Sequence, residues 1–221
     1  MNKVSKFIKR LSELELENCF NPYADKCDVY DLPQAPKIRK SNLGKILNSL
    51  ESSKNIDVWV GRDLGYRGGR RTGLALTDEI SLNLYANHLR IESLDRSTFG
   101  HPVKERTAYN IYTILSEIET PVLTWNVFPL HPHNPCEPFT NRQHTRAEGR
   151  IGITFLEELC DIFPIRRLVA IGNHAASWAN EVAVPNYRVR HPSYGGQSEF
   201  LSQMRDIYHL PQPIHAQMRL L

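Results

Sequence analysis

The sequence has no long apolar run, and none approaches the roughly 18 consecutive apolar residues that a membrane-spanning helix requires. Its first ten residues, Met1–Arg10, are basic, but they lack the apolar core and the small-residue cleavage site of a secretion signal. These absences predict a cytoplasmic protein with no membrane partner.

Cysteine is scarce as well. The 221 residues include 4 cysteines, at positions 19, 27, 136 and 160, and no Cys-x-x-Cys pair. So few and so scattered cysteines do not make the disulfide framework of a small secreted protein. Cys160 falls in a stretch with helical periodicity, 155–163, where we expect a core thiol.

Positive and negative residues nearly balance, and the net charge is +3. Binding to a polyanion would therefore depend on local clusters of basic residues rather than on the total. Three clusters are present: Lys37, Arg39 and Lys40; Arg62, Arg67, Arg70 and Arg71; and Arg188, Arg190 and His191. Each is either a phosphate-binding patch or an ordinary solvated surface.

Strand-like and helix-like segments alternate along the chain. Short apolar runs predict strands at 58–60, 122–127, 168–171 and 187–190. Helical spacing of apolar residues predicts helices at 4–17, 42–52, within 77–94, and at 104–118, 146–163, 175–181 and 199–208. No internal repeat or low-complexity tract is visible.

This alternation predicts an α/β protein, a three-layer α/β/α sandwich with a mostly parallel central sheet of about four strands. With 41% hydrophobic residues the chain can bury one ample core. We expect residues 55–221 to form one compact domain and residues 1–54 to be an N-terminal helical extension packed on it. The proline-containing segment 19–40 is expected to be irregular.

The segment after the first strand is unusually rich in glycine, at positions 61, 65, 68, 69 and 73, and it holds one carboxylate, Asp63, among arginines. Glycines let a backbone approach a ligand closely. In parallel sheets the ligand lies beyond the carboxyl ends of the strands, where loops 126–135 and 191–197 also arrive. The sequence predicts a ligand site built from these three loops.

The segments Gly61-Arg-Asp-Leu-Gly65 and Gly68-Gly-Arg-Arg-Thr-Gly73 resemble the first motif of the uracil-DNA glycosylase superfamily, a strand followed by Gly-x-Asp and a glycine-rich turn. His191-Pro-Ser193 is similar to its second motif, and Arg167–Ala176 to the strand and helix before it. The resemblance covers roughly residues 55 to 205. It implies the superfamily's fold, with DNA as the partner.

The resemblance also implies a reaction, in which a flipped pyrimidine is released by hydrolysis of its N-glycosidic bond and an abasic site remains. Such bonds break through an oxocarbenium-like sugar and a departing anion. Asp63 is the expected group that orients water near the sugar, and His191 the expected donor to the leaving base. No lysine is placed as a Schiff-base nucleophile, so we expect a monofunctional glycosylase without strand cleavage.

The end of the second predicted strand is where the superfamily places an asparagine that reads the edge of the base. Asn126 fits that role, because an amide offers a donor and an acceptor side by side. An ungapped match puts Trp125 there instead, and the choice stays open.

Other contacts to a flipped nucleotide are expected from the same loops. Tyr66 or Phe128 would stack on the base, and Tyr194 or Gln197 would fill the gap in the duplex. Ser193 and the amides of the glycine loop would bind phosphates. The complete set of expected substrate-binding residues is Gly61, Arg62, Gly65, Tyr66, Gly69, Phe128, Asn126, Ser193, Tyr194 and Gln197.

One departure from the superfamily pattern bears on the substrate. The uracil-specific branch has Pro-Tyr after its aspartate, and the tyrosine ring excludes pyrimidines with a group at C5. Leu64 and Gly65 occupy those positions here. The resemblance therefore implies uracil or a C5-modified pyrimidine as substrate, including the heavily modified cytosines of phage DNA, and both repair and defence against foreign DNA stay open.

Some members of the superfamily carry a four-cysteine iron-sulfur cluster. Pro129 stands where those members place a cysteine, so we expect no cluster, no other cofactor and no metal. We also expect a monomer. Two alternatives remain: a non-catalytic sensor of modified or damaged nucleic acid, and a metal-dependent hydrolase built on His131 and His133, which the intervening proline disfavours.

Overall fold

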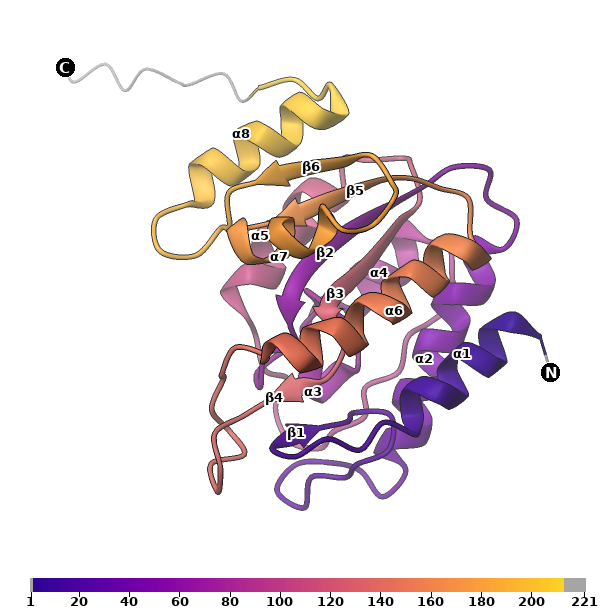
Figure 1. Ribbon diagram of the computed structural model, residues 1–221, viewed down its shortest axis with the longest axis vertical. Coiled ribbons are helices and arrows are strands. Elements are labelled where there is room, and N and C mark those ends of the chain that lie inside the picture. Colours follow the sequence, from indigo (N-terminus) through magenta and orange to yellow (C-terminus); the bar gives the residue numbers. More distant parts are fainter. Residues whose placement is uncertain (1, 213–221) are drawn as a thin grey trace.

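The computed structural model describes residues 2–212 and has a sheet between two layers of helices (Figure 1). The sheet has 4 strands in the order β3-β2-β5-β6, and every pairing in it is parallel. The predicted α/β/α class is confirmed. Its strands are β2 (Ile56–Asp63), β3 (Val122–Phe128), β5 (Ile165–Ile171) and β6 (Asn186–Val189).

Helices cover both faces of this sheet. Figure 1 shows α6 (Arg146–Ile162) and α7 (Asn173–Ala179) in front of it, and α4 (Leu82–His88) and α5 (Arg106–Leu115) behind. The last helix, α8 (Gln197–Tyr208), contacts the sheet through Tyr208, whose hydroxyl accepts a hydrogen bond from the indole of Trp59 at 2.6 Å. The apolar core is continuous through both layers.

The edge strand β3 is covered by side chains from α4. The backbone N–H of Thr124 donates to the hydroxyl of Tyr85 at 2.8 Å, and that of Val122 donates to His88 Nε2 at 3.2 Å. These bonds satisfy donors that an open sheet edge would leave to another chain.

The N-terminal segment shares the core of the sheet. In α1 (Lys3–Ser12) the ring of Phe7 lies 5.7 Å from that of Trp125 on β3 and 5.6 Å from that of Phe155 on α6. Helix α2 (Ala35–Leu50) packs beside α1 and adds buried residues to the same core: Leu43, Ile46, Leu47 and Leu50.

Three local predictions were wrong. Helix α2 begins at Ala35 rather than near residue 42, because Pro36 lies in its first turn, where proline is favourable rather than disruptive. Helix α1 ends at Ser12 rather than at residue 17. Finally, the predicted loop after β3 contains β4 (His131–Pro132), which pairs antiparallel with β1 (Cys19–Phe20).

The glycine-rich segment itself contains one helical turn, α3 (Gly69–Thr72), which ends at Gly73 with a left-handed φ of 72°. Throughout residues 2–212, no helix combines the length and the apolar character needed to cross a membrane.

Candidate active site

Asp63 is the last residue of β2, and its carboxylate is 5% exposed. One oxygen, Oδ2, accepts a hydrogen bond from Arg62 Nε at 2.5 Å. The other, Oδ1, accepts one from Nδ1 of His144, the residue just before the N-cap of α6. The candidate catalytic carboxylate is thus held from two sides.

His144 was not predicted as a site residue. Its ring lies between those of Phe128, at 6.0 Å, and Trp178, at 5.6 Å. Nothing in the sequence marks it, because 81 residues separate it from Asp63 and no motif joins them.

His191 follows β6 and has a defined orientation. The backbone N–H of Ser193 donates to its Nδ1 at 3.2 Å, so Nδ1 accepts and the proton of the neutral ring lies on Nε2. Burial, followed by the charges of Arg62 and Arg190, lowers the pKa of His191. A side chain at Gly172 would come within 3.2 Å of the ring's Cβ, so glycine there lets the histidine approach the sheet.

Asp63 and His191 lie at the same edge of the sheet, beyond the carboxyl ends of β2 and β6, with β5 between these strands. Arg62 interacts with both residues. Its guanidinium donates a hydrogen bond to Asp63, and its positive charge contributes to the lowered pKa of His191.

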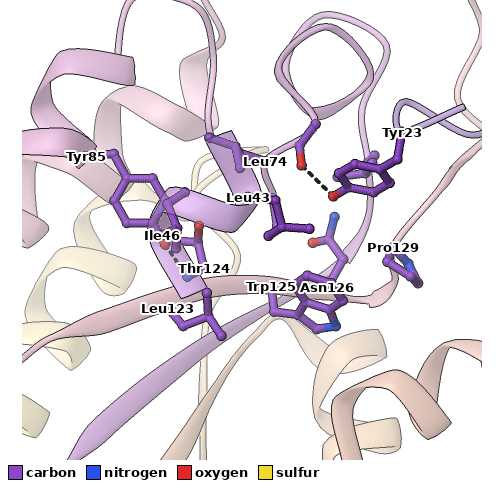
Figure 2. A pocket seen from close by; sticks show the side chains of 13 residues that line it. Tyr23, Leu43, Ile46, Leu74, Tyr85, Leu123, Thr124, Trp125, Asn126 and Pro129 are labelled. Atoms are coloured by element: carbon purple, nitrogen blue, oxygen red, sulfur yellow. Dashed lines mark hydrogen bonds between the residues drawn. The ribbon is translucent and has the colours of Figure 1, made fainter. Parts of the chain in front are cut away.

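Asn126 is 1% exposed, and within the described chain neither its Oδ1 nor its Nδ2 has a hydrogen-bond partner. Figure 2 shows its amide on the pocket side of β3 and the indole of Trp125 on the other side, where Phe7 packs on it. On the neighbouring strand, a Cβ at Gly61 would lie only 2.4 Å from Asn126 Oδ1. Because Asn126 rather than Trp125 faces the pocket, Asn126 is the better candidate for the residue that reads the edge of a base.

The pocket beside Asn126 is narrow, about 10 Å³, which is room for one water molecule rather than for a pyrimidine. Tyr23 forms part of its wall and donates its hydroxyl hydrogen to the carbonyl of Gly73 at 2.5 Å (Figure 2). Leu76, with a left-handed φ of 56°, lies against Gly61 at the same place. The wall also includes Leu64, Leu74, Ala75, Thr124 and Pro129.

The two candidate stacking residues differ. Phe128 is fully buried against His144, so its ring has no open face for a base. Tyr66 is half-buried, and the guanidinium of Arg67 lies over its ring at 5.4 Å while donating to its hydroxyl at 2.7 Å.

The loop after His191 presents its side chains to solvent. Tyr194 is 97% exposed and has a left-handed φ of 52°, which is uncommon for a residue other than glycine. Gln197 is also exposed, as the first residue of α8. Ser193, by contrast, has its hydroxyl 2.7 Å from His191 Nδ1.

Two of the arginines in the glycine loop are structural. Arg70 is buried and donates to the hydroxyl of Tyr30 at 2.8 Å, and buried Arg71 pairs with Glu79 at 3.0 Å. Arg39 of the first basic cluster is also buried. These side chains tie the N-terminal segment to the loop, so the accessible arginines of the loop are Arg62 and Arg67.

His131, one of the two histidines of the alternative metal site, has both ring nitrogens in contact with other protein groups. Nδ1 of His131 lies 3.1 Å from Arg70 Nη1, and its Nε2 lies 2.9 Å from the carbonyl of Thr140. Burial and the charge of Arg70 lower the pKa of His131 to about 3. Residues 2–212 hold no group of ≥ 3 His, Cys, Asp or Glu side chains placed to bind a metal.

The space beside Gly65, where the sequence suggested room for a group on C5 of a pyrimidine, is partly filled. A Cβ at Gly65 would meet Oε1 of Glu105 at 3.4 Å, and one at Gly68 would clash with Oε2 of the same carboxyl group. Burial, followed by the charge of Asp78, raises the pKa of Glu105. Leu64 packs against Gly69.

The parallel sheet with helices on both faces, and the likeness to a solved structure, define a class: the protein has the uracil-DNA glycosylase fold. A particular solved structure to which it is similar is SMUG2 of Pedobacter heparinus, a member of that superfamily, with a TM-score of 0.65 over 95% of this chain and 97% of that one. Sequence identity is 12%, so this likeness establishes the fold alone. No model of a protein family matches the sequence, nor does any curated protein.

Proposed function

We propose that the protein is a monofunctional DNA glycosylase that flips a pyrimidine out of DNA, hydrolyses its N-glycosidic bond and leaves an abasic site. The observation that carries this proposal is the unpaired, buried amide of Asn126 at the same sheet edge as Asp63 and His191. The fold shared with SMUG2, a DNA glycosylase, supports it.

Asp63 is the candidate group on the sugar side of the bond. As the bond breaks, the base departs with the bonding electron pair and positive charge develops on the sugar. Each carboxylate oxygen of Asp63 has a further lone pair besides the one bonded to Arg62 or His144. Asp63 can therefore orient a water molecule toward the sugar and stabilise the cation.

His191 is the candidate group on the base side. Its Nε2–H can donate to the carbonyl oxygen on which negative charge develops, which strengthens that hydrogen bond in the transition state. The lowered pKa favours the neutral ring near pH 7, so His191 acts as a neutral hydrogen-bond donor rather than as an imidazolium acid.

Asn126 is the candidate reader of the base edge. Leaving a buried amide unpaired costs about 1–3 kcal/mol, so a ligand that supplies both a donor and an acceptor regains that energy. A pyrimidine needs more space than the pocket offers, and Leu76 borders Asn126 and Gly61. We propose that the segment 73–77 moves aside when a base enters.

The loop after His191 would face the duplex. Fully exposed Tyr194 is suited to filling the gap that a flipped nucleotide leaves, and Arg62 and Arg67 supply positive charge for phosphates. We propose DNA containing uracil or a C5-modified pyrimidine as substrate, with the carboxyl group of Glu105 next to the C5 substituent, and a protein that acts as a monomer.

The test is base release from oligonucleotides that carry uracil, 5-hydroxymethyluracil, 5-hydroxymethylcytosine or glucosylated 5-hydroxymethylcytosine, with alkali to reveal abasic sites. We expect release from at least one substrate by the wild type and a loss of about 1,000-fold in Asp63→Asn. Strand cleavage without alkali would contradict the monofunctional reaction. Binding to these DNAs without release from any of them would instead support a sensor.

A further inference from the structure

Among residues 2–212, the side chain of His144 makes one polar contact, and that contact is with Asp63. We infer that His144 is a positioning residue, which holds the Asp63 carboxylate in the orientation that base release requires. This inference rests on the proposed function and adds a residue that none of the sequence motifs includes.

The direction of the hydrogen bond follows from its partners. A carboxylate only accepts, so Nδ1 of His144 carries the hydrogen that it donates to Asp63 Oδ1. The other ring nitrogen, Nε2, is buried and has no partner among residues 2–212. Nδ1 of the ring therefore carries a hydrogen, and the ring makes no competing polar contact with residues 2–212.

The ring is also fixed in place. Phe128 and Trp178 flank it, and a Cβ at Gly149 would lie 2.9 Å from its Cδ2, so the first turn of α6 closes on it. The imidazole therefore has little freedom to rotate away from Asp63.

The backbone around His144 is anchored on both sides. Thr145 is the N-cap of α6 and forms a capping box with Glu148, whose carboxylate also pairs with Arg142 at 2.6 Å. Arg142, two residues before His144, and Thr145, the residue after it, are thus both bonded to Glu148 at the start of α6, which gives the donor a stable position.

The second partner of Asp63 is less restrained. The side chain of Arg62 is 38% exposed, whereas that of His144 is 1% exposed. If His144 loses its donor, the carboxylate can rotate toward Arg62. A displacement of about 1 Å at a reacting group can reduce the rate by about 100-fold, and DNA binding should change little.

The variants His144→Asn, His144→Gln and His144→Leu test this role on the full chain. The amide nitrogen of asparagine can take the place of Nδ1, that of glutamine extends to the position of Nε2, and leucine donates nothing. With a substrate that the wild type cleaves, we expect kcat to fall about 100-fold in the glutamine and leucine variants. We expect the asparagine variant to retain kcat within about 10-fold, and the Kd for uncleavable substrate DNA to change by less than about 3-fold in all three.

A control is His88→Leu, which removes a half-buried histidine at the opposite end of β3. We expect it to lower the melting temperature and to leave kcat unchanged. An asparagine variant no more active than the leucine variant, with both folded, would overturn the inference.

A second readout is independent of activity. In ¹⁵N NMR spectra of the wild type we expect a protonated Nδ1 on His144, and in Asp63→Asn we expect that signal to shift because a neutral amide oxygen replaces the charged acceptor. An unprotonated Nδ1 in the wild type would overturn the positioning role even if base release occurs. Failure of base release on every substrate, with the NMR result as expected, would overturn the proposed reaction and the positioning role in it, and would leave only the hydrogen bond.

Discussion

Individual buried histidines serve different ends in this protein. His191 carries its hydrogen on Nε2 at the edge of the site, whereas His131 contacts Arg70 through Nδ1 and the carbonyl of Thr140 through Nε2. Both have lowered pKa values, for which burial is the main cause. The environment of the ring, rather than its presence in a motif, therefore separates a candidate catalytic histidine from a structural one.

The low pKa of His131 predicts a loss of stability in acid. Its pKa is about 3 in the folded protein and about 6.5 in an unfolded chain, so between these values unfolding takes up a proton. The contribution is complete above pH 6.5 and is lost as the pH falls toward 3, with a slope of up to about 1.4 kcal/mol per pH unit. Urea denaturation between pH 7 and pH 4 measures this slope.

The variant His131→Gln should show a shallower dependence of the unfolding free energy on pH, whereas His101→Gln, at an exposed histidine, should follow the wild type. Equal slopes in all three proteins would contradict the assignment.

Glu105 predicts a preference among substrates. Its carboxyl group lies next to Gly65 and can accept a hydrogen bond from a hydroxyl group on C5. We expect Glu105→Ala to reduce kcat/KM for a hydroxymethylated pyrimidine by about 10-fold relative to the unsubstituted base, the equivalent of one hydrogen bond. Competition between the two oligonucleotides measures the ratio of their kcat/KM values. An unchanged ratio in Glu105→Ala would mean that Glu105 does not contact the group on C5.

At the scale of elements, the close approach of α6 to β3 determines where the site residues meet. A Cβ at Gly152 would lie 2.0 Å from the carbonyl oxygen of Val127, so only glycine allows this packing distance. The N-cap of the same helix is Thr145, next to His144. A shift of α6 away from the sheet would therefore also withdraw the donor to Asp63.

Gly152→Ala should accordingly destabilise the protein by about 3 kcal/mol, because the added methyl group meets rigid backbone rather than a movable side chain. Thr154→Ala, on the exposed side of the same helix, should change stability by less than about 0.5 kcal/mol. Thermal denaturation of the two variants compares them. A Gly152 variant as stable as the wild type would mean that the helix packs farther from β3.

At the scale of the whole molecule, the N-terminal segment is part of the structure that holds the site. Phe7 completes the core beneath Trp125, and Tyr23 forms a wall of the pocket beside Asn126. Arg70 and Arg71 hold this segment from the glycine loop.

Deletion of residues 2–12 should therefore unfold the protein rather than release an independent domain. The deletion removes three buried apolar side chains, those of Val4, Phe7 and Leu11, and exposes the core residues that they cover. The burial of each side chain contributes about 2 kcal/mol to the stability. Their sum is comparable with the whole stability of a typical domain, about 5–15 kcal/mol. Circular dichroism and a melting curve test this, and a cooperative transition near that of the full chain would contradict it.

The fold was largely predictable because its signals are local. The alternation of apolar runs and helical spacing predicted all four strands of the main sheet, and strand ends predicted that Asp63, Asn126 and His191 would reach one edge. The predicted start of α2 was wrong, because proline disrupts the interior of a helix but is favourable in the first turn, where Pro36 lies.

The α/β order and the loops that carry Asp63, Asn126 and His191 could thus be read from the amino-acid sequence, because periodicity and strand-end position depend on neighbouring residues. That His144 donates to Asp63, that Tyr23 borders Asn126 and that Arg70 is buried emerges from the folded chain alone. Those contacts join residues far apart in the chain, and the packing of complete elements, rather than any short pattern, brings them together.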